Sequence, residues 1–167
     1  MRLMSVAFTE DAVRSRTKTV TRRKGWTFAK PGDRVTLCRK VMGRKKGEPL
    51  ERLVDVELVD VRREPLGAIT KDDVAREGFP GMGPVEFIDK FFVQAQRMTA
   101  FDEVTRVEWR YLTYYVEMYD ATWGGWHKVR ASDLTDEPAT FATLAEAEAV
   151  LADLRARSAY EYRIKEG

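Results

Sequence analysis

The segment TKTVTRR, residues 17–23, places next to one another residue types that can do acyl-transfer chemistry. Lys18 and Thr21 are three positions apart, where a short helix is expected to give way to a strand. In a regular strand their side chains would face opposite sides, but in the turn before a strand they can converge. Burial lowers the pKa of a lysine, and a neutral lysine can take the proton of a threonine hydroxyl. The pair is therefore a candidate base and nucleophile, with two ordinary surface residues as the alternative.

The same segment belongs to a concentrated run of positive charge. Residues 1–46 contain 14 Lys and Arg against 3 Asp and Glu, a net charge of +11, whereas residues 113–167 contain 6 against 10, a net charge of −4. This segregation favours a polyanion on the N-terminal part of the chain, with a solvated basic face as the alternative. Trp26 and Phe28 follow the basic run and are expected to stack on bases. The residues predicted to contact nucleic acid are Arg16, Arg22, Arg23, Lys24, Trp26, Lys30, Arg39 and Lys40.

Other classes of site find little support in the sequence. The single Cys38 excludes an intrachain disulfide framework, and the single His127 argues against a Cys/His zinc site. We expect Cys38 to be buried in a strand and His127 to lie on the surface. No phosphate-binding loop, dinucleotide fingerprint or nucleophile elbow is present, so we predict neither a cofactor nor a metal. Without an apolar run of membrane-spanning length or a signal peptide, a cytoplasmic protein with no membrane partner is predicted.

Alternation and capping signals predict the elements that position these residues. Thr9 and Thr70 are expected to cap helices, and Gly78 to end the second of them. The apolar phase slips after Leu58, which predicts a bulge in a long curved strand of the kind that suits a small barrel. Phe87, Ile88 and Phe91 form the apolar stripe of a third helix. Strands are predicted over 3–8, 17–23, 34–41, 53–61 and 105–112, and helices over 9–15, 70–78 and 85–95.

After residue 112 the pattern changes. Residues 113–121 and 126–131 flank TWGG, a hairpin signal, and Thr143 and Glu146 have capping-box spacing before an Ala-rich helix. A last strand is predicted over 160–166. A ββαβ unit of this size is near the lower limit for independent stability, so we expect it to pack on the first unit. The predicted domains are a barrel over 1–112 and a small C-terminal module over 113–167.

Within the first 112 residues, the order of the landmarks resembles that of the ASCH domain family. These landmarks are KTVTRR, PGDRVTL, REPL, ITKDDVAREGF, FIDKFF and VTRVEWRYL. The family consists of small β-barrels related to PUA domains, and the likeness is greatest to ASCH proteins encoded by phages of actinobacteria. The resemblance implies an α+β fold, namely a PUA-like barrel with flanking short helices, here followed by the ββαβ appendage.

The family signature, G-x-K-x-x-E-x-R, is matched in part. Lys18 and Arg23 fit it, whereas Arg16 stands at the glycine position and Thr21 at the glutamate position. A threonine there resembles the amidohydrolase branch, which removes the acetyl group from N4-acetylcytidine with a lysine, a threonine three residues on and a later glutamate. The resemblance implies Lys18 as base, Thr21 as nucleophile and Glu77 as proton donor or as orienter of the lysine, with Arg23 neutralising an oxyanion or a phosphate. The structural alternative is that Glu77 pairs with Lys18 or Arg23 to hold a helix on the barrel.

The predicted function is recognition of RNA or of a modified nucleoside or nucleotide. Hydrolysis of N4-acetylcytidine-type amides is its enzymatic form. Two alternatives stay open: a phage-encoded module that binds a host protein in the host cytoplasm, and a nuclease that acts on RNA. The sequence leaves the oligomeric state open.

Overall fold

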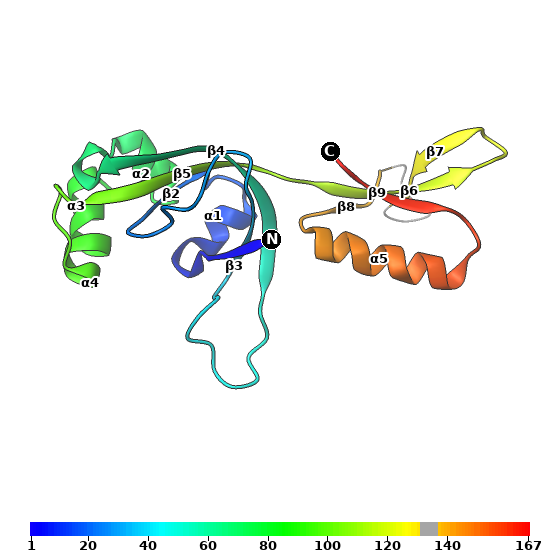
Figure 1. Cartoon of the computed structure of the whole chain (residues 1–167), viewed down its shortest axis with the longest axis horizontal. Helices are drawn as coiled ribbons and strands as arrows, with labels where there is room; N and C mark the ends of the chain where they lie inside the picture. The colour runs from blue at the N-terminus through cyan, green and yellow to red at the C-terminus, as the bar shows by residue number, and fades with distance from the viewer. Residues whose placement is uncertain (131–136) are drawn as a thin grey trace.

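The computed structural model describes residues 1–130 and 137–167, which form two β-sheets with associated helices (Figure 1). The first sheet has five strands in the order β1-β3-β4-β5-β2. β1 and β3 pair in parallel, and the other neighbours are antiparallel. The strands are β1 (Arg2–Ser5), β2 (Val20–Arg23), β3 (Arg34–Cys38), β4 (Arg52–Pro65) and β5 (Glu103–Tyr111).

The long strand β4 gives this sheet its curvature. Its pairing with β5 shifts register between Leu58 and Asp60, at the position where the slip of the apolar phase predicted a bulge. A bulge bends the strand and increases its twist. β4 therefore pairs with β3 in its first half and with β5 further on, and the sheet curls into a half-barrel. This is the α+β architecture that the sequence predicted.

Apolar side chains fill the inside of the half-barrel. They alternate along the strands, as the period of a half-buried strand requires, and Cys38 is buried at the end of β3, as expected. The fully or nearly fully buried residues of this core are Met4, Val6, Val13, Val35, Leu37, Leu53, Val54, Val56, Leu58, Val107 and Trp109.

Short helices cover the half-barrel. Thr70 caps α2 through a capping box with Asp73, and Gly78 follows α2 with a φ of 100°, so both predicted helix signals are confirmed. The predicted third helix is interrupted by one π-helical turn, and Phe87 and Phe92 anchor it in a second core. The helical segments are η1 (Ala7–Thr9), α1 (Glu10–Arg14), η2 (Leu66–Ala68), α2 (Lys71–Arg76), α3 (Pro84–Ile88), η3 (Asp89–Val93) and α4 (Gln94–Gln96).

The first predicted strand, 3–8, was too long, and Thr9 stands at the N-cap position of α1 without making the predicted capping bond. β1 pairs only with β3, and β3 ends at Cys38 rather than at residue 41, so the chain beyond Ser5 has no strand to pair with. It turns into η1 instead, which leaves Phe8 almost fully exposed. The hydroxyl of Thr9 donates to the carbonyl of Val6 (3.3 Å) and makes no capping bond to α1.

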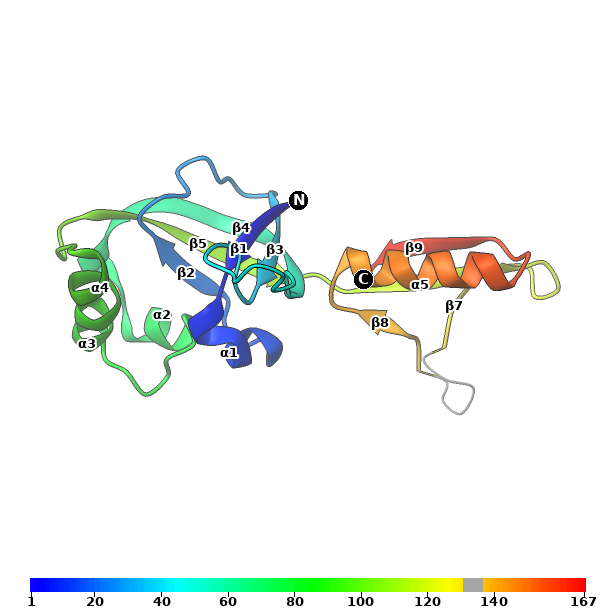
Figure 2. The same ribbon diagram turned by 90° about the horizontal axis from the view of Figure 1, so that it is seen from below.

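The second sheet is built around β6 (Tyr114–Asp120). β9 (Tyr162–Glu166) pairs along one edge of β6, while β7 (Gly125–Lys128) and β8 (Thr140–Phe141) pair along the other. α5 (Leu144–Arg157) packs against one face of this sheet (Figure 2). The predicted hairpin, the Thr143 capping box and the exposure of His127 are confirmed, whereas the two-residue β8 was missed. Residue 131, the last of the predicted hairpin, lies outside the described residues.

The two sheets meet at Asp55 of β4. The backbone amide of Asp55 donates to the carbonyl of Ala142 (2.9 Å), and its Oδ2 accepts from the amide of Leu144 (2.8 Å) at the start of α5. Arg34 forms an ion pair with Glu166 (2.6 Å) beside these bonds. Leu112 also packs with Tyr114 and Ala147 of the C-terminal module, whereas the apolar core of the half-barrel draws nearly all its residues from the first 112.

Truncation after Thr113 is therefore expected to leave a soluble barrel that unfolds cooperatively, with a lower melting temperature than the full chain. The half-barrel keeps its own core, and the loss is that of the bonds to Asp55 and the packing of Ala142. Circular dichroism during heating measures both properties. An aggregated or non-cooperative truncated chain would show that the C-terminal module completes the core.

Candidate functional site

Lys18 lies in a turn that hydrogen bonds hold from both sides. The amide of Lys18 donates to the carbonyl of Ala12 in α1 (3.0 Å), and the amide of Thr19 donates to the carbonyl of Arg76 at the end of α2 (3.0 Å). Arg16 has a left-handed φ of 58°. Glycine adopts that conformation without steric cost, so an arginine stands here at a backbone angle that favours glycine.

Lys18 and Glu77 meet in a buried contact. The ammonium of Lys18 donates to Oε2 of Glu77 (3.0 Å) and to the backbone carbonyl of Glu77 (2.6 Å). Both residues are buried, with 3% and 4% of their surface exposed. Because Glu77 is the C-cap of α2, the ammonium also lies at the negative end of that helix.

Two opposing effects act on the ammonium. Burial lowers the pKa of Lys18, and the Glu77 carboxylate raises it without fully compensating, so the pKa of Lys18 lies below its ordinary value. The guanidinium groups of Arg22 and Arg23 lower it further. A lysine held in this way reaches its neutral, proton-accepting form at lower pH than a surface lysine.

Thr21 points to the same side of the sheet as the ring of Trp109. Thr21 of β2 is directly opposite Val107 of β5, and directly opposed residues of an antiparallel pair share a face. Val107 and Trp109, two residues apart, also share that face. The Lys18 ammonium lies 5.9 Å from the centre of the Trp109 ring. No hydrogen bond joins the amine of Lys18 to the hydroxyl of Thr21 within the described part of the chain.

The side chain of Arg22 lies on the opposite face of β2 from that of Thr21, in a buried ion-pair network. Its guanidinium contacts Glu64 (2.7 Å) and Asp73 (2.7 Å), and it lies 3.6 Å from Oε1 of Glu77. Asp73 also accepts from Arg106, which is directly opposite Arg22 on β5 (3.0 Å). Because its side chain is enclosed by carboxylates, Arg22 is placed to stabilise the fold and not to contact a phosphate at the surface.

Arg23 is half-buried on the same side as Thr21. Its Nη2 donates to the backbone carbonyl of Ser5 (2.6 Å), and burial lowers the pKa of its guanidinium. Four buried polar atoms near this cluster have no hydrogen-bond partner among the described residues. They are Arg22 Nη1, Arg23 Nε, Glu77 Oε1 and Trp109 Nε1. Arg22 Nη1 and Glu77 Oε1 form an ion pair with each other at 3.6 Å. Buried polar groups are nearly always paired, so the other two atoms, Arg23 Nε and Trp109 Nε1, favour a polar ligand in the region.

The other predicted nucleic-acid contacts are spread over the surface. Lys24, Lys30 and Lys40 are exposed and form no ion pair with any described residue. Arg39 is paired with Glu10 and Glu51, and Arg16 donates to the hydroxyl of Thr113 (3.2 Å). Trp26 is partly buried against the barrel core and contacts the exposed ring of Phe28, 5.3 Å between centres.

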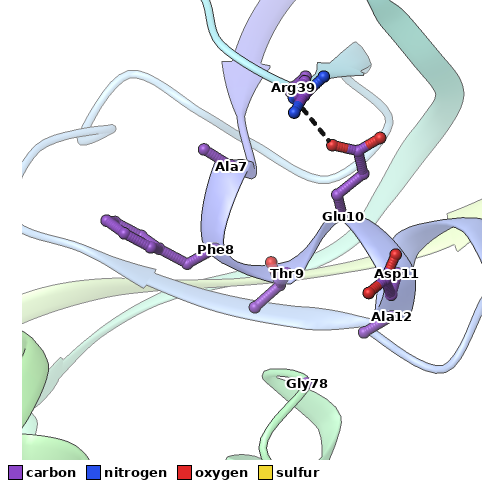
Figure 3. Close-up of a pocket in the computed structure, with 8 residues that line it drawn as sticks. All are labelled: Ala7, Phe8, Thr9, Glu10, Asp11, Ala12, Arg39 and Gly78. Atoms are coloured by element: carbon purple, nitrogen blue, oxygen red, sulfur yellow. Dashed lines mark ion pairs between the residues drawn. The ribbon is translucent and has the colours of Figure 1, made fainter.

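A hollow of about 500 Å³ opens beside the cluster (Figure 3). It is bounded by residues 7–12, by Arg39 and by Gly78, the residue that follows Glu77. The ion pair between Arg39 and Glu10 (3.2 Å) crosses one side of it. A Cβ at residue 78 would lie 3.1 Å from Thr9 and Ala12, so a glycine keeps this rim close to the end of α2.

Sequence reasoning missed three members of the cluster. They are Asp73, which joins two arginines, together with Arg106 and Trp109. In the sequence, Asp73 is marked only as an acid in the first turn of a predicted helix, and Arg106 and Trp109 only as positions of a predicted strand. The one available signal was the alternation of charged residues with aromatic and β-branched ones in TRVEWRYL. This pattern indicates a strand with charged side chains on one face and apolar side chains on the other.

Within residues 1–130 and 137–167, no group of three or more His, Cys, Asp or Glu side chains is arranged to hold a metal ion. None of the helices in those ranges has the length and apolar character needed to cross a membrane.

Comparison with known proteins found similarity among solved structures alone. No family model and no curated protein matches the chain. Among solved structures, an ASCH domain from Lactobacillus crispatus has a TM-score of 0.48 at 11% identity, covering 66% of this chain and 79% of that one. A protein of the family DUF984 from Enterococcus faecalis has a TM-score of 0.46 at 14% identity, covering 62% and 69%. An ASCH domain is thus among the structures that this chain resembles, as predicted, and likeness at this level concerns the fold alone.

Proposed function

We propose that the chain binds an N4-acylated cytidine at the cluster around Lys18 and hydrolyses its amide bond. The observation that supports this most directly is the Lys18–Glu77 contact, a buried ammonium whose pKa is lowered and which is held 3.0 Å from a carboxylate. Strongly perturbed titratable groups are characteristic of functional sites.

The proposed reaction begins with the neutral amine of Lys18. It takes the proton of the Thr21 hydroxyl as the threonine oxygen forms a bond to the acyl carbon. The carbon–nitrogen bond then breaks, and the proton passes to N4 of cytosine, so that cytidine leaves and the acyl group remains on Thr21. Water attacks this ester, releases acetate and restores the hydroxyl. Glu77 holds the lysine in place throughout.

In this proposal, Arg23 stabilises the negative charge of the tetrahedral intermediate. Its guanidinium is on the Thr21 side of β2, whereas Arg22 is held by Glu64 and Asp73 on the other side. The tetrahedral intermediate carries a negative oxygen, and a fixed cation in a water-poor site stabilises such an oxygen strongly. The unpaired Nε of Arg23 and Nε1 of Trp109 offer donors to a bound nucleoside.

Incubation of the purified protein with N4-acetylcytidine tests the proposal. We expect cytidine and acetate to appear in equal amounts, as measured by chromatography. N6-acetyladenosine should be a poor substrate. If no cytidine appears, the hydrolysis proposal is wrong. Equilibrium dialysis with the same nucleoside then shows whether the cluster is a recognition site without turnover, and failure to bind would reject that as well.

A further inference from the structure

The C-terminal sheet has one face that α5 does not cover. The strand register places Tyr115, Glu117 and Tyr119 of β6 on the same side, because residues two apart along a strand share a face. Tyr114 and Ile164, in contrast, pack towards α5 with Ala147. The residues of β7 and β9 that lie directly opposite Tyr115, Glu117 and Tyr119 therefore also point away from α5. The side chains of this open face are Tyr115, Glu117, Tyr119, Trp126, Lys128, Arg163 and Lys165.

The composition of the open face differs from that of the module that carries it. Residues 113–167 have a net charge of −4, yet the open face has three cations and one carboxylate. That carboxylate, Glu117, is already paired with Arg163 (2.7 Å). Lys128 and Lys165 are exposed. Three of the six Lys and Arg residues of the module thus lie on the face that no described helix covers.

Aromatic rings and cations alternate across the open face. The Lys128 ammonium lies 3.9 Å from the ring centre of Tyr115, and the Arg163 guanidinium lies 4.1 Å from that of Trp126. Trp126 in turn contacts Tyr119 edge to face, with 5.5 Å between ring centres. Neighbouring strands lie about 4.8 Å apart, so these groups form a continuous patch.

We propose that the open face of the C-terminal sheet binds single-stranded nucleic acid. Unpaired bases stack on aromatic rings and on arginine planes, while lysines neutralise the phosphates between them. A double helix exposes no ring faces for such stacking. An acidic protein would use the cations but has no need of three aromatic rings between them. The proposal does not depend on hydrolysis at Lys18, because the two sites share no residue.

Fluorescence anisotropy of the full-length protein with fluorescein-labelled decauridylate and decathymidylate tests the proposal. Loss of one stacked base corresponds to roughly 5- to 150-fold in affinity, and we expect Trp126→Ala to weaken binding within that range. Trp126→Phe should retain most of the affinity. Lys128→Ala should reduce the slope of log affinity against log salt by about 0.7, the value for one phosphate on a single strand.

Two controls separate this surface from the rest of the chain. Arg157→Ala removes an exposed cation of α5, on the opposite side of the module, and should leave binding unchanged. Lys24→Ala tests the N-terminal basic segment, which the sequence predicted to contact nucleic acid, as the alternative binding surface. The proposal is wrong if neither oligonucleotide binds, or if Trp126→Ala binds as well as wild type while Lys24→Ala does not. Equal displacement by a duplex of the same length would also overturn it.

Discussion

Thr21→Ala is expected to reduce the release of cytidine from N4-acetylcytidine by more than about 10³-fold, because the hydroxyl is the proposed nucleophile and no other group can replace it. Binding of the nucleoside should change little, since the hydroxyl acts mainly in the transition state. We expect the fold to tolerate the variant, because the hydroxyl of Thr21 forms no hydrogen bond within the described residues. Rates of cytidine release and equilibrium dialysis measure the two effects separately. Thr27→Ala, an exposed threonine of the following loop, is the matched control.

Lys18→Arg should lower the rate by roughly 10²- to 10⁴-fold, the usual contribution of a general base. A guanidinium keeps the positive charge beside Glu77 but does not lose its proton at accessible pH. Lys24→Arg, an exposed neighbour, should leave the rate unchanged. Because an arginine is larger than the buried lysine, thermal unfolding must accompany the assay. Glu77→Gln, which keeps the shape of the side chain, supplies a second test of the same pair.

The pH dependence provides a readout that a purely structural contact would not give. Glu77 raises the pKa of Lys18 against the effect of burial. Removal of the carboxylate charge in Glu77→Gln should therefore lower the pKa of Lys18 further and move the rise of the rate to lower pH. If Thr21→Ala is as active as wild type, or if Glu77→Gln changes only the melting temperature, the three residues hold α2 to the barrel and catalyse nothing.

Local sequence signals predicted much of the fold because each has a local physical cause. Thr70 and Thr143 cap helices through bonds to residues three positions on, and Gly78 supplies a backbone angle that other residues avoid. The bulge in β4 follows from the phase of its own apolar residues. The end of β1 could not be predicted in this way, because it is set by the length of β3, whose paired residues lie 33 positions away in the sequence.

In the candidate site, too, local features could be predicted from the sequence, and contacts between distant segments could not. The spacing of Lys18 and Thr21, together with a family resemblance, led to a candidate pair, of which the structure shows Lys18 in buried contact with Glu77. The separation of Arg22 from Arg23 was not predicted, although strand alternation requires it. Its consequence depends on Asp73, which reaches β2 only through packing of α2 against the sheet edge. Pairings between residues about 50 positions apart leave no trace in local spacing.

The charge network beneath α2 leads to the largest stability effect that we expect. Asp73 accepts from Arg22 (2.7 Å) and from Arg106 (3.0 Å), and all three residues are buried. Replacing one member of a buried ion pair leaves its partners charged and without compensation, which typically costs roughly 3–5 kcal/mol. Asp73→Asn should therefore lower the free energy of unfolding by about that amount, as measured by urea denaturation. Asp72→Asn, an exposed acid in the same helical turn, should cost no more than about 1 kcal/mol.

Acid titration tests whether the carboxylate charge causes this loss. Burial alone would raise the pKa of Asp73, but hydrogen bonds from Arg22 and Arg106 outweigh it and lower the pKa to about 2. A depressed carboxyl pKa stabilises the folded state above its unfolded value near 4, and this contribution is lost as the pH falls towards 2. The difference in unfolding free energy between wild type and Asp73→Asn should therefore be constant above about pH 5 and shrink below pH 4. A difference that stays constant down to pH 2 would assign the loss to the capping box of α2, which Asp73 also completes, and not to its ion pairs.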